Sequence, residues 1–252
     1  MNLHKFSHLA SVYDETRPVP EELLLFFRNE VINYLRTNCA EKKRYSLLSI
    51  GIGTGRAELS LWSKNVELYG IDINKEMLKV AKQRNRSVYT CVANALEIPF
   101  SHSFDLVSMI HTIQFVKPIT KFYTQLKSVS KNVCIGDLYT SLYDNIIVSY
   151  YVNELEKNNY FTPSNSLDKV EKELEKWGNQ VIKNKEIRAK IKLEKIYKII
   201  KSQSLSRFWN VPLEIHVKVM QSLDYFIKKE KIELYEEVTT PAKAILRFID
   251  LN

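Results

Sequence analysis

Three glycines at alternate positions and a carboxylate further along the chain are the residue types here that suit binding of a nucleoside. Gly51, Gly53 and Gly55 directly follow the apolar run at residues 47–50. Glycines at the end of a buried strand permit a tight turn and let a ligand approach the backbone closely. Asp72 lies 21 residues beyond Gly51, at the end of the next predicted strand. An acid at that place holds ribose hydroxyls in Rossmann-like sites.

Two later strand ends carry further polar residues. Asn94 and Ala95 follow a strand predicted over residues 87–92, and His111 follows one predicted over 104–110. Asn94 taken alone is an ordinary turn residue. His111 is our candidate general base for an acceptor that must lose a proton, and it is equally suited to be a wall of the pocket.

These residues need elements to bring them together, and the hydrophobic pattern supplies a series of alternating strands and helices. Such alternation indicates an α/β fold, a Rossmann-like and mostly parallel sheet with helices on both faces. Right-handed crossovers place every carboxyl end of the parallel strands at one edge, so the ligand crevice is expected there. The predicted strands are 47–50, 66–71, 87–92, 104–110 and 132–137, and the predicted helices are 21–37, 57–64, one capped by Asn74, and 118–130.

Beyond residue 137 the pattern changes to a tyrosine-rich and lysine-rich segment. It predicts a helix over 167–177, a strand over 187–193, helices over 194–205 and 213–228, and two strands over 232–238 and 244–249 joined at residues 239–241. We interpret the helices between 194 and 228 as a cap inserted before the last strands. We therefore expect one domain over residues 1–252: an N-terminal arm and helix (1–40), a cofactor-binding core (45–137), a substrate cap with connecting elements (138–230) and closing strands (231–252).

Composition narrows the class of protein. The 252 residues are 45% hydrophobic and 26% charged, as in ordinary globular proteins, and no window predicts a membrane span or signal peptide, so we expect a cytoplasmic protein. Three scattered cysteines predict neither a disulfide frame nor a metal site. Much of the net charge of +8 lies between residues 183 and 201. That run is either a nucleic-acid footprint or a solvated face, and its alternation of basic and apolar residues over 187–193 favours the solvated face of a strand.

The glycine spacing separates two classes of nucleotide-binding enzyme. A dinucleotide-binding dehydrogenase would place its third glycine or alanine at position 56, where this chain has Arg56. Gly55 instead completes a G-x-G-x-G pattern. The segment 45–137 resembles a class I S-adenosylmethionine-dependent methyltransferase, with that family's motifs in the same order and at the same spacing. The run at residues 97–107 is similar to the family's Pro-Phe … Phe-Asp-Leu-Val signature.

This resemblance implies a role for each matching residue. Gly51, Gly53 and Gly55 would face the methionine end of S-adenosylmethionine, and Asp72 would bind the ribose. The residues implied to contact the adenine are Ile73, Met77, Asn94 and Ala95. The arm at residues 13–18 resembles the stretch that closes over the cofactor in small-molecule methyltransferases, which makes Tyr13 and Arg17 candidate contacts.

One position departs from the family. Members usually carry Asp or Glu where this chain has Ser49, and that acid orients the methionine portion of the cofactor. Losing one charge-assisted hydrogen bond would weaken binding by roughly 1.5 to 3 kcal/mol. Three readings therefore stay open: a methyltransferase with a small-molecule acceptor, which we favour; an RNA or protein methyltransferase that uses the basic surface; and a non-catalytic binding partner with this fold. The acceptor and the oligomeric state are not indicated by the sequence.

Overall fold

The computed structural model describes residues 10, 13–160 and 167–252. Its elements in chain order are α2 (Glu21–Asn38), β1 (Tyr45–Ile50), η1 (Glu58–Leu61), β2 (Val66–Asp72), α3 (Lys75–Arg84), β3 (Tyr89–Val92), β4 (Leu106–Ile110), η2 (Ile113–Phe115), α4 (Ile119–Val129), β5 (Asn132–Thr140), α5 (Ile146–Lys157), α6 (Leu167–Leu174), β6 (Asn179–Lys192), α7 (Leu193–Lys201), η3 (Ser206–Phe208), α8 (Leu213–Lys229) and β7 (Glu237–Asp250).

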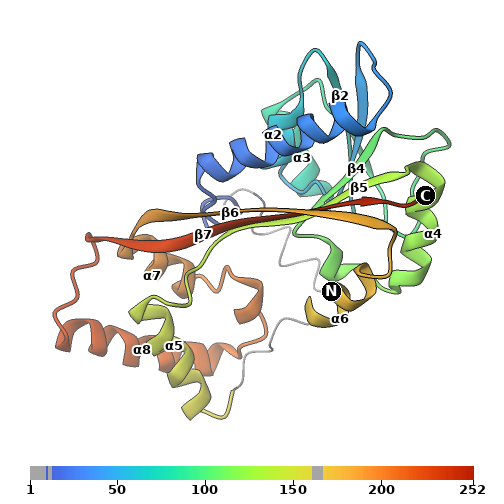
Figure 1. Cartoon of the computed structure of the whole chain (residues 1–252). Coiled ribbons are helices and arrows are strands. Elements are labelled where there is room, and N and C mark those ends of the chain that lie inside the picture. The colour runs from blue at the N-terminus through green and yellow to red at the C-terminus, as the bar shows by residue number, and fades with distance from the viewer. Residues whose placement is uncertain (1–9, 11–12, 161–166) are drawn as a thin grey trace.

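In the described part of the chain, seven strands form one sheet in the order β3-β2-β1-β4-β5-β7-β6 (Figure 1). Strands β1 to β5 are parallel, and β7 runs antiparallel to both of its neighbours. The carboxyl ends of β1 to β4 thus lie at one edge, as the alternating pattern predicted. The expected Rossmann-like α/β fold, with helices on both faces, is confirmed.

Helices pack on both faces of the sheet, and each buries a row of apolar residues against it. On α2, Leu23, Phe27, Val31 and Leu35 recur at helical spacing and are fully buried on one face. Helix α4 packs its own apolar residues against the opposite face. Each such side chain contributes about 1.5 to 3 kcal/mol of burial free energy, so the stripes fix which way each helix faces.

The end of the chain differs from its prediction. Residues 232–238 and 244–249 were expected to form two strands, but β7 is one continuous strand across Thr240 and Pro241. Strand β5 ends at Thr140, and beyond it the carbonyl of Pro241 accepts from the amide of Ser141 at 2.7 Å. Pro241 has no N–H to return, and the Thr240 hydroxyl donates to the Ser141 carbonyl instead. The Thr240 side chain therefore makes the hydrogen bond that the backbone of Pro241 cannot make.

Other predicted boundaries also shift. The helix expected over residues 57–64 is only the 3₁₀ turn η1, because the chain turns back at Ser63, which bridges to Val66 at the start of β2. Strand β6 is longer than the predicted 187–193, although its exposed basic residues Arg188, Lys190 and Lys192 do alternate with less exposed apolar ones as expected. Helix α5 lies in a stretch for which no element was predicted.

Helices α5, α7 and α8 gather at one end of the molecule, beside the far ends of the long strands β6 and β7 (Figure 1). They share a third apolar cluster, distinct from the two at the sheet faces. Within it, the Tyr151 hydroxyl lies 2.7 Å from Nδ1 of His216, and Nε2 of His216 lies 3.0 Å from the carbonyl of Lys201. Burial lowers the pKa of His216, so the ring is held neutral between these two partners.

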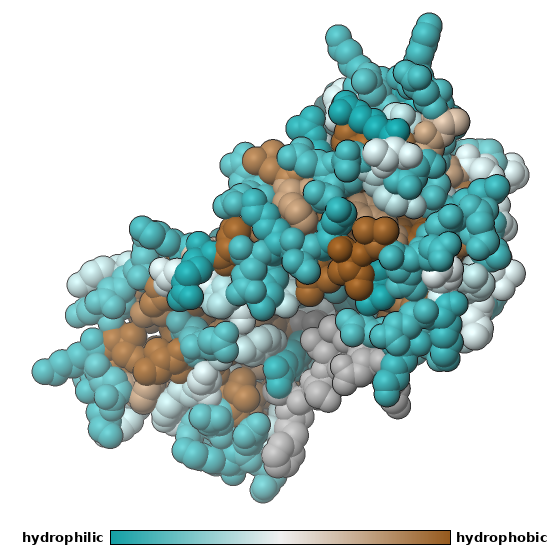
Figure 2. Space-filling model, viewed as in Figure 1, coloured by the Kyte–Doolittle hydropathy of each residue, from teal (hydrophilic) through white to brown (hydrophobic). Residues whose placement is uncertain are grey.

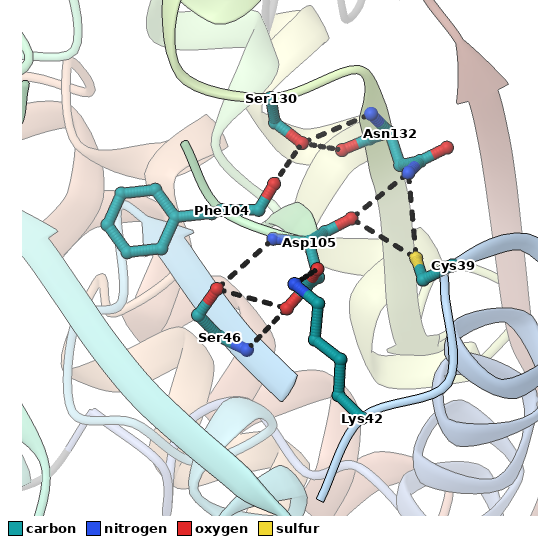
Figure 3. Close-up of polar contacts among 7 residues, drawn as sticks. All are labelled: Cys39, Lys42, Ser46, Phe104, Asp105, Ser130 and Asn132. Carbon is teal, nitrogen blue, oxygen red and sulfur yellow. Dashed lines mark hydrogen bonds and ion pairs between the residues drawn. The ribbon is translucent and has the colours of Figure 1, made fainter. Parts of the chain in front are cut away.

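Polar side chains join the opposite edge of the sheet, at the amino ends of β1, β4 and β5 (Figure 3). Asp105 accepts from the backbone amide of Ser46 at 2.8 Å and from its hydroxyl at 3.1 Å, and it pairs with Lys42 at 2.5 Å. Asn132 donates to the Asp105 carbonyl at 3.1 Å. This network, which we call the Asp105 latch, fixes the register of the three strands whose other ends carry glycines and polar residues.

The face of the molecule shown in Figure 2 is mostly hydrophilic, with exposed apolar side chains in separate small groups. Among the described residues, no helix has both the length and the apolar character needed to cross a membrane.

Candidate functional site

The loop after β1 forms the floor of the site. Its first two amides, of Gly51 and Ile52, donate to the carbonyl of Ile71 at 2.7 and 3.1 Å, which ties the loop to the end of β2. Gly51 has a φ of +71°, and a Cβ there would collide with the side chain of Thr112. Gly53 has a φ of +55°, and a Cβ there would meet nothing nearer than 4.0 Å. Gly51 is thus required by packing, whereas Gly53 keeps space open for a ligand.

Asp72 stands at the end of β2 and faces the same loop. Its Oδ2 accepts from the amide of Gly53 at 2.9 Å, and its Oδ1 accepts from the amide of Asn74 at 2.8 Å. Burial raises the pKa of Asp72, and these backbone donors act against that rise. Each carboxylate oxygen retains an acceptor site beyond its backbone bond, so the group can also accept from ligand hydroxyls.

A cavity of about 310 Å³ lies between the glycine loop and the strand ends. It brings together most of the residues that the sequence singled out. The predicted residues that line it are Tyr13, Gly51, Gly53, Asp72, Ile73, Met77, Asn94, Ala95 and His111. Gly55 and Arg17 are not part of its lining.

Arg17 lies against the helical end of the molecule. Its guanidinium carbon sits 4.1 Å from the centroid of the Tyr13 ring, and Nη2 donates to the carbonyl of Ser204 at 2.7 Å. Burial lowers the pKa of Arg17. Arg17 therefore touches Tyr13, which lines the cavity, and links this arm to the segment between α7 and α8.

The arm is also attached to the glycine loop. Asp14 accepts from the Thr54 hydroxyl at 2.9 Å and forms ion pairs with Arg56, at 3.9 Å, and Arg84. Sequence reasoning did not single out Asp14, because an acid in a polar arm gives no spacing signal of its own.

His111 is held from two sides by β5. Its Nδ1 lies 2.8 Å from Oδ1 of Asp137, and its Nε2 lies 2.7 Å from the carbonyl oxygen and 3.1 Å from the amide of Leu138. His111 also has a φ of +57°, an uncommon left-handed conformation that turns the chain at the end of β4. The ring is therefore fixed in the wall of the cavity with both nitrogens engaged.

Glu58 is a site residue that the sequence did not reveal. It lies on η1, lines the cavity and is only 3% exposed. Burial raises the pKa of Glu58 to about 7, against the opposing effects of its own backbone amide, the Ser49 hydroxyl and the Arg56 charge. An acid three residues after Gly55 looks like an ordinary helix-start residue, and only the fold places it beside Ser49.

Comparison with known proteins finds a similar domain in the segment that holds the site. Residues 48–133, which contain the glycine loop, Asp72, Asn94 and His111, match the family model described as a methyltransferase domain. This segment, about a third of the chain, is therefore similar to methyltransferase domains. This match agrees with the resemblance seen in the sequence.

Solved structures agree with this fold at low sequence identity. A candidate type II methyltransferase from Anaeromyxobacter dehalogenans is 13% identical with a TM-score of 0.63, covering 93% of this chain and 97% of that one. A candidate methyltransferase of an antibiotic biosynthesis pathway from Anabaena variabilis is 17% identical with a TM-score of 0.55, covering 92% and 98%. The YcgJ protein of Bacillus subtilis is 18% identical with a TM-score of 0.50, covering 90% and 99%.

A curated relative, the uncharacterized protein MJ1123 of Methanocaldococcus jannaschii, is 28% identical over 128 residues. The match covers 49% of this chain and 58% of the length of that relative.

The geometry of the site suits a nucleoside cofactor such as S-adenosylmethionine. The open position at Gly53 admits a ligand against the backbone, and Asp72 offers acceptors for ribose hydroxyls. Ile73 and the buried Met77 give apolar surface next to Asp72, as a base ring requires.

Proposed function

We propose that this chain transfers the methyl group of S-adenosylmethionine to a small-molecule acceptor. The observation that carries the proposal is the single cavity in which the open face of Gly53, the Asp72 carboxylate and the His111 ring meet. Tyr13 and Val19 of the arm also line that cavity, so an acceptor must fit beneath the arm. A small molecule satisfies this requirement better than a folded macromolecule.

Each residue then has a defined task. Asp72 accepts from the ribose hydroxyls, Gly53 leaves room for the methionine portion, and Ile73, Met77, Asn94 and Ala95 surround the adenine. The cofactor supplies an activated methyl group, so positioning supplies most of the rate enhancement. Tyr13 closes the mouth of the cavity, and Arg17 holds Tyr13 in place through the stacked contact at 4.1 Å.

His111 acts on the acceptor side. Asp137 fixes its ring through Nδ1, and Nε2 takes the acceptor proton by exchanging its contact with Leu138 for the acceptor. Such a base is needed for a hydroxyl or carbon acceptor and not for a neutral amine. With a panel of candidate acceptors, His111→Gln is expected to abolish transfer to hydroxyl or carbon and to spare transfer to amines.

We propose a division of the chain that matches this arrangement. The core at residues 45–137 binds the cofactor, the arm and helix at 1–40 cover it, and the elements at 138–230 form the acceptor side before the closing strand. In the described part of the chain no residue of α5, α7 or α8 lines the cavity itself. Their proposed contribution is to hold the arm, through the bond from Arg17 to Ser204.

The basic surface supports a nucleic-acid acceptor less well. Arg188, Lys190 and Lys192 lie on β6, four strand positions from β1. At the usual spacing between strands, β6 lies roughly 19 Å from β1 across the sheet. Binding of RNA that weakens steeply with added salt would favour the RNA reading instead.

Titration calorimetry with S-adenosylhomocysteine tests the proposal. The wild-type chain is expected to bind, and Asp72→Ala to weaken binding roughly tenfold to a hundredfold, since hydrogen bonds to a charged group are lost. Glu175→Ala removes an exposed carboxylate on another part of the surface and serves as the matched control. Absence of binding by the wild-type chain at millimolar ligand would overturn the enzyme reading and favour a non-catalytic partner.

A further inference from the structure

A carboxyl group buried in the wall of the cofactor cavity has no role in the scheme above. Glu58 is 3% exposed and reaches the cavity from η1, just below the glycine loop. A buried carboxyl is costly to keep in a protein unless a cation or a hydrogen-bond donor meets its charge. Its position therefore calls for a partner.

The surroundings of Glu58 form a small polar patch in an apolar core. Ser49 of β1, Ser108 of β4 and Cys134 of β5 are in register across the sheet, so their side chains share one face. All three are fully buried, and within the described residues the hydroxyls of Ser49 and Ser108 have no hydrogen-bond partner. Glu58 lies close enough to this row to interact with both Ser49 and Cys134.

The charged residues around Glu58 do not fully balance the negative charge of its ionised carboxylate. Arg56 favours the ionised carboxylate, but its own guanidinium pairs with Asp14 at 3.9 Å. Asp72 opposes ionisation from across the cavity, and burial raises the pKa of Glu58 to about 7. A ligand that brings a positive charge to this wall would find an acceptor there.

We propose that Glu58 supplies the carboxylate that this family usually carries at the position of Ser49, and that it binds the α-ammonium group of the cofactor's methionine portion. The acid has moved from the strand before the glycine loop to the turn after it, where Glu58 lines the cavity and lies close to Ser49 behind it. This inference rests on the proposed function, because it assigns the methionine end of the same site.

Two ligands distinguish the contribution of Glu58 to binding from that of the other site residues. S-adenosylhomocysteine carries the amino-acid portion, and 5′-methylthioadenosine keeps the adenosine and sulfur but lacks the ammonium. By calorimetry at pH 8, Glu58→Gln is expected to weaken S-adenosylhomocysteine binding roughly tenfold to a hundredfold and to leave methylthioadenosine binding within about twofold. Asp72→Ala should weaken both ligands alike.

A relocation of the acid completes the test. Ser49→Asp combined with Glu58→Gln returns a carboxylate to the strand position, and it should recover most of the lost S-adenosylhomocysteine affinity. Binding of S-adenosylhomocysteine by Glu58→Gln at the wild-type level would overturn the inference, as would an equal loss for both ligands. Either result leaves the proposed function standing, provided that the wild-type chain binds and that Asp72→Ala binds more weakly.

Discussion

At the scale of single residues, the site contains two carboxylates that burial affects in the same direction. The pKa of both Asp72 and Glu58 is raised. Asp72 accepts from the backbone amides of Gly53 and Asn74, whereas the ionised form of Glu58 is favoured by its own backbone amide and by the charge of Arg56. A cationic ligand therefore gains more from Glu58, and the unliganded protein loses more by keeping it ionised.

The cost of keeping Glu58 ionised predicts that the stability of the unliganded protein depends on pH. The pKa of Glu58 is about 7 in the folded chain, above its ordinary value of 4.5, so the folded state binds the extra proton and wild-type stability falls as pH rises through this window. Glu58→Gln removes the effect. We expect the variant to be more stable than wild type by about 3 kcal/mol at pH 8, with most of the difference arising between pH 5 and 7. Urea unfolding of the unliganded proteins at a series of pH values measures this, and a difference that does not change with pH would contradict it.

The two acids also show how far sequence reasoning reaches for a site. Asp72 was predictable because its place depends only on where a strand ends, and parallel strands end at one edge. Glu58 was not, because its relation to Ser49 depends on a short turn packing back under the loop. Arg17 matched a family pattern, yet its side chain points toward Ser204, which the pattern alone does not encode.

At the scale of elements, the Asp105 latch is expected to stabilise the sheet that presents the site. Asp105→Ala removes the acceptor of two bonds from Ser46 and the partner of Lys42, which should lower the free energy of unfolding by about 2 to 3 kcal/mol. Lys42→Ala should cost less than about 1 kcal/mol, because the lysine is largely exposed to solvent.

Chemical denaturation of both variants beside wild type measures the two losses. Equal losses would mean that the ion pair with Lys42, rather than the bonds to Ser46, carries the contribution of the latch.

The elements themselves were predictable where the hydrophobic period is long and regular, as in α2, where Leu23, Phe27, Val31 and Leu35 line one face. The prediction for β7 was wrong because Thr240 and Pro241 read as a turn. Strand β5 ends at Thr140, so the carbonyl of the next residue, Ser141, is within reach of the Thr240 hydroxyl. That hydroxyl makes the hydrogen bond for which Pro241 has no amide. Local composition does not contain that information.

At the scale of the whole molecule, the arm joins the parts that the proposed reaction needs. Asp14 attaches it to the glycine loop through Thr54, and Arg17 attaches it to the helical end through Ser204. Tyr13, which precedes Asp14 and lies under the Arg17 guanidinium, lines the cavity. The arm is therefore the part of the molecule through which the cofactor site and the helical cap can affect each other.

A crystal structure with bound S-adenosylhomocysteine tests the central claim most directly. We predict ribose hydroxyls on Asp72, adenine beside Ile73 and Asn94, and the amino-acid end against Gly53, with the sulfur facing the His111 side of the cavity. A ligand bound elsewhere on the chain, or one that enters this cavity without contact to Asp72, would contradict the account.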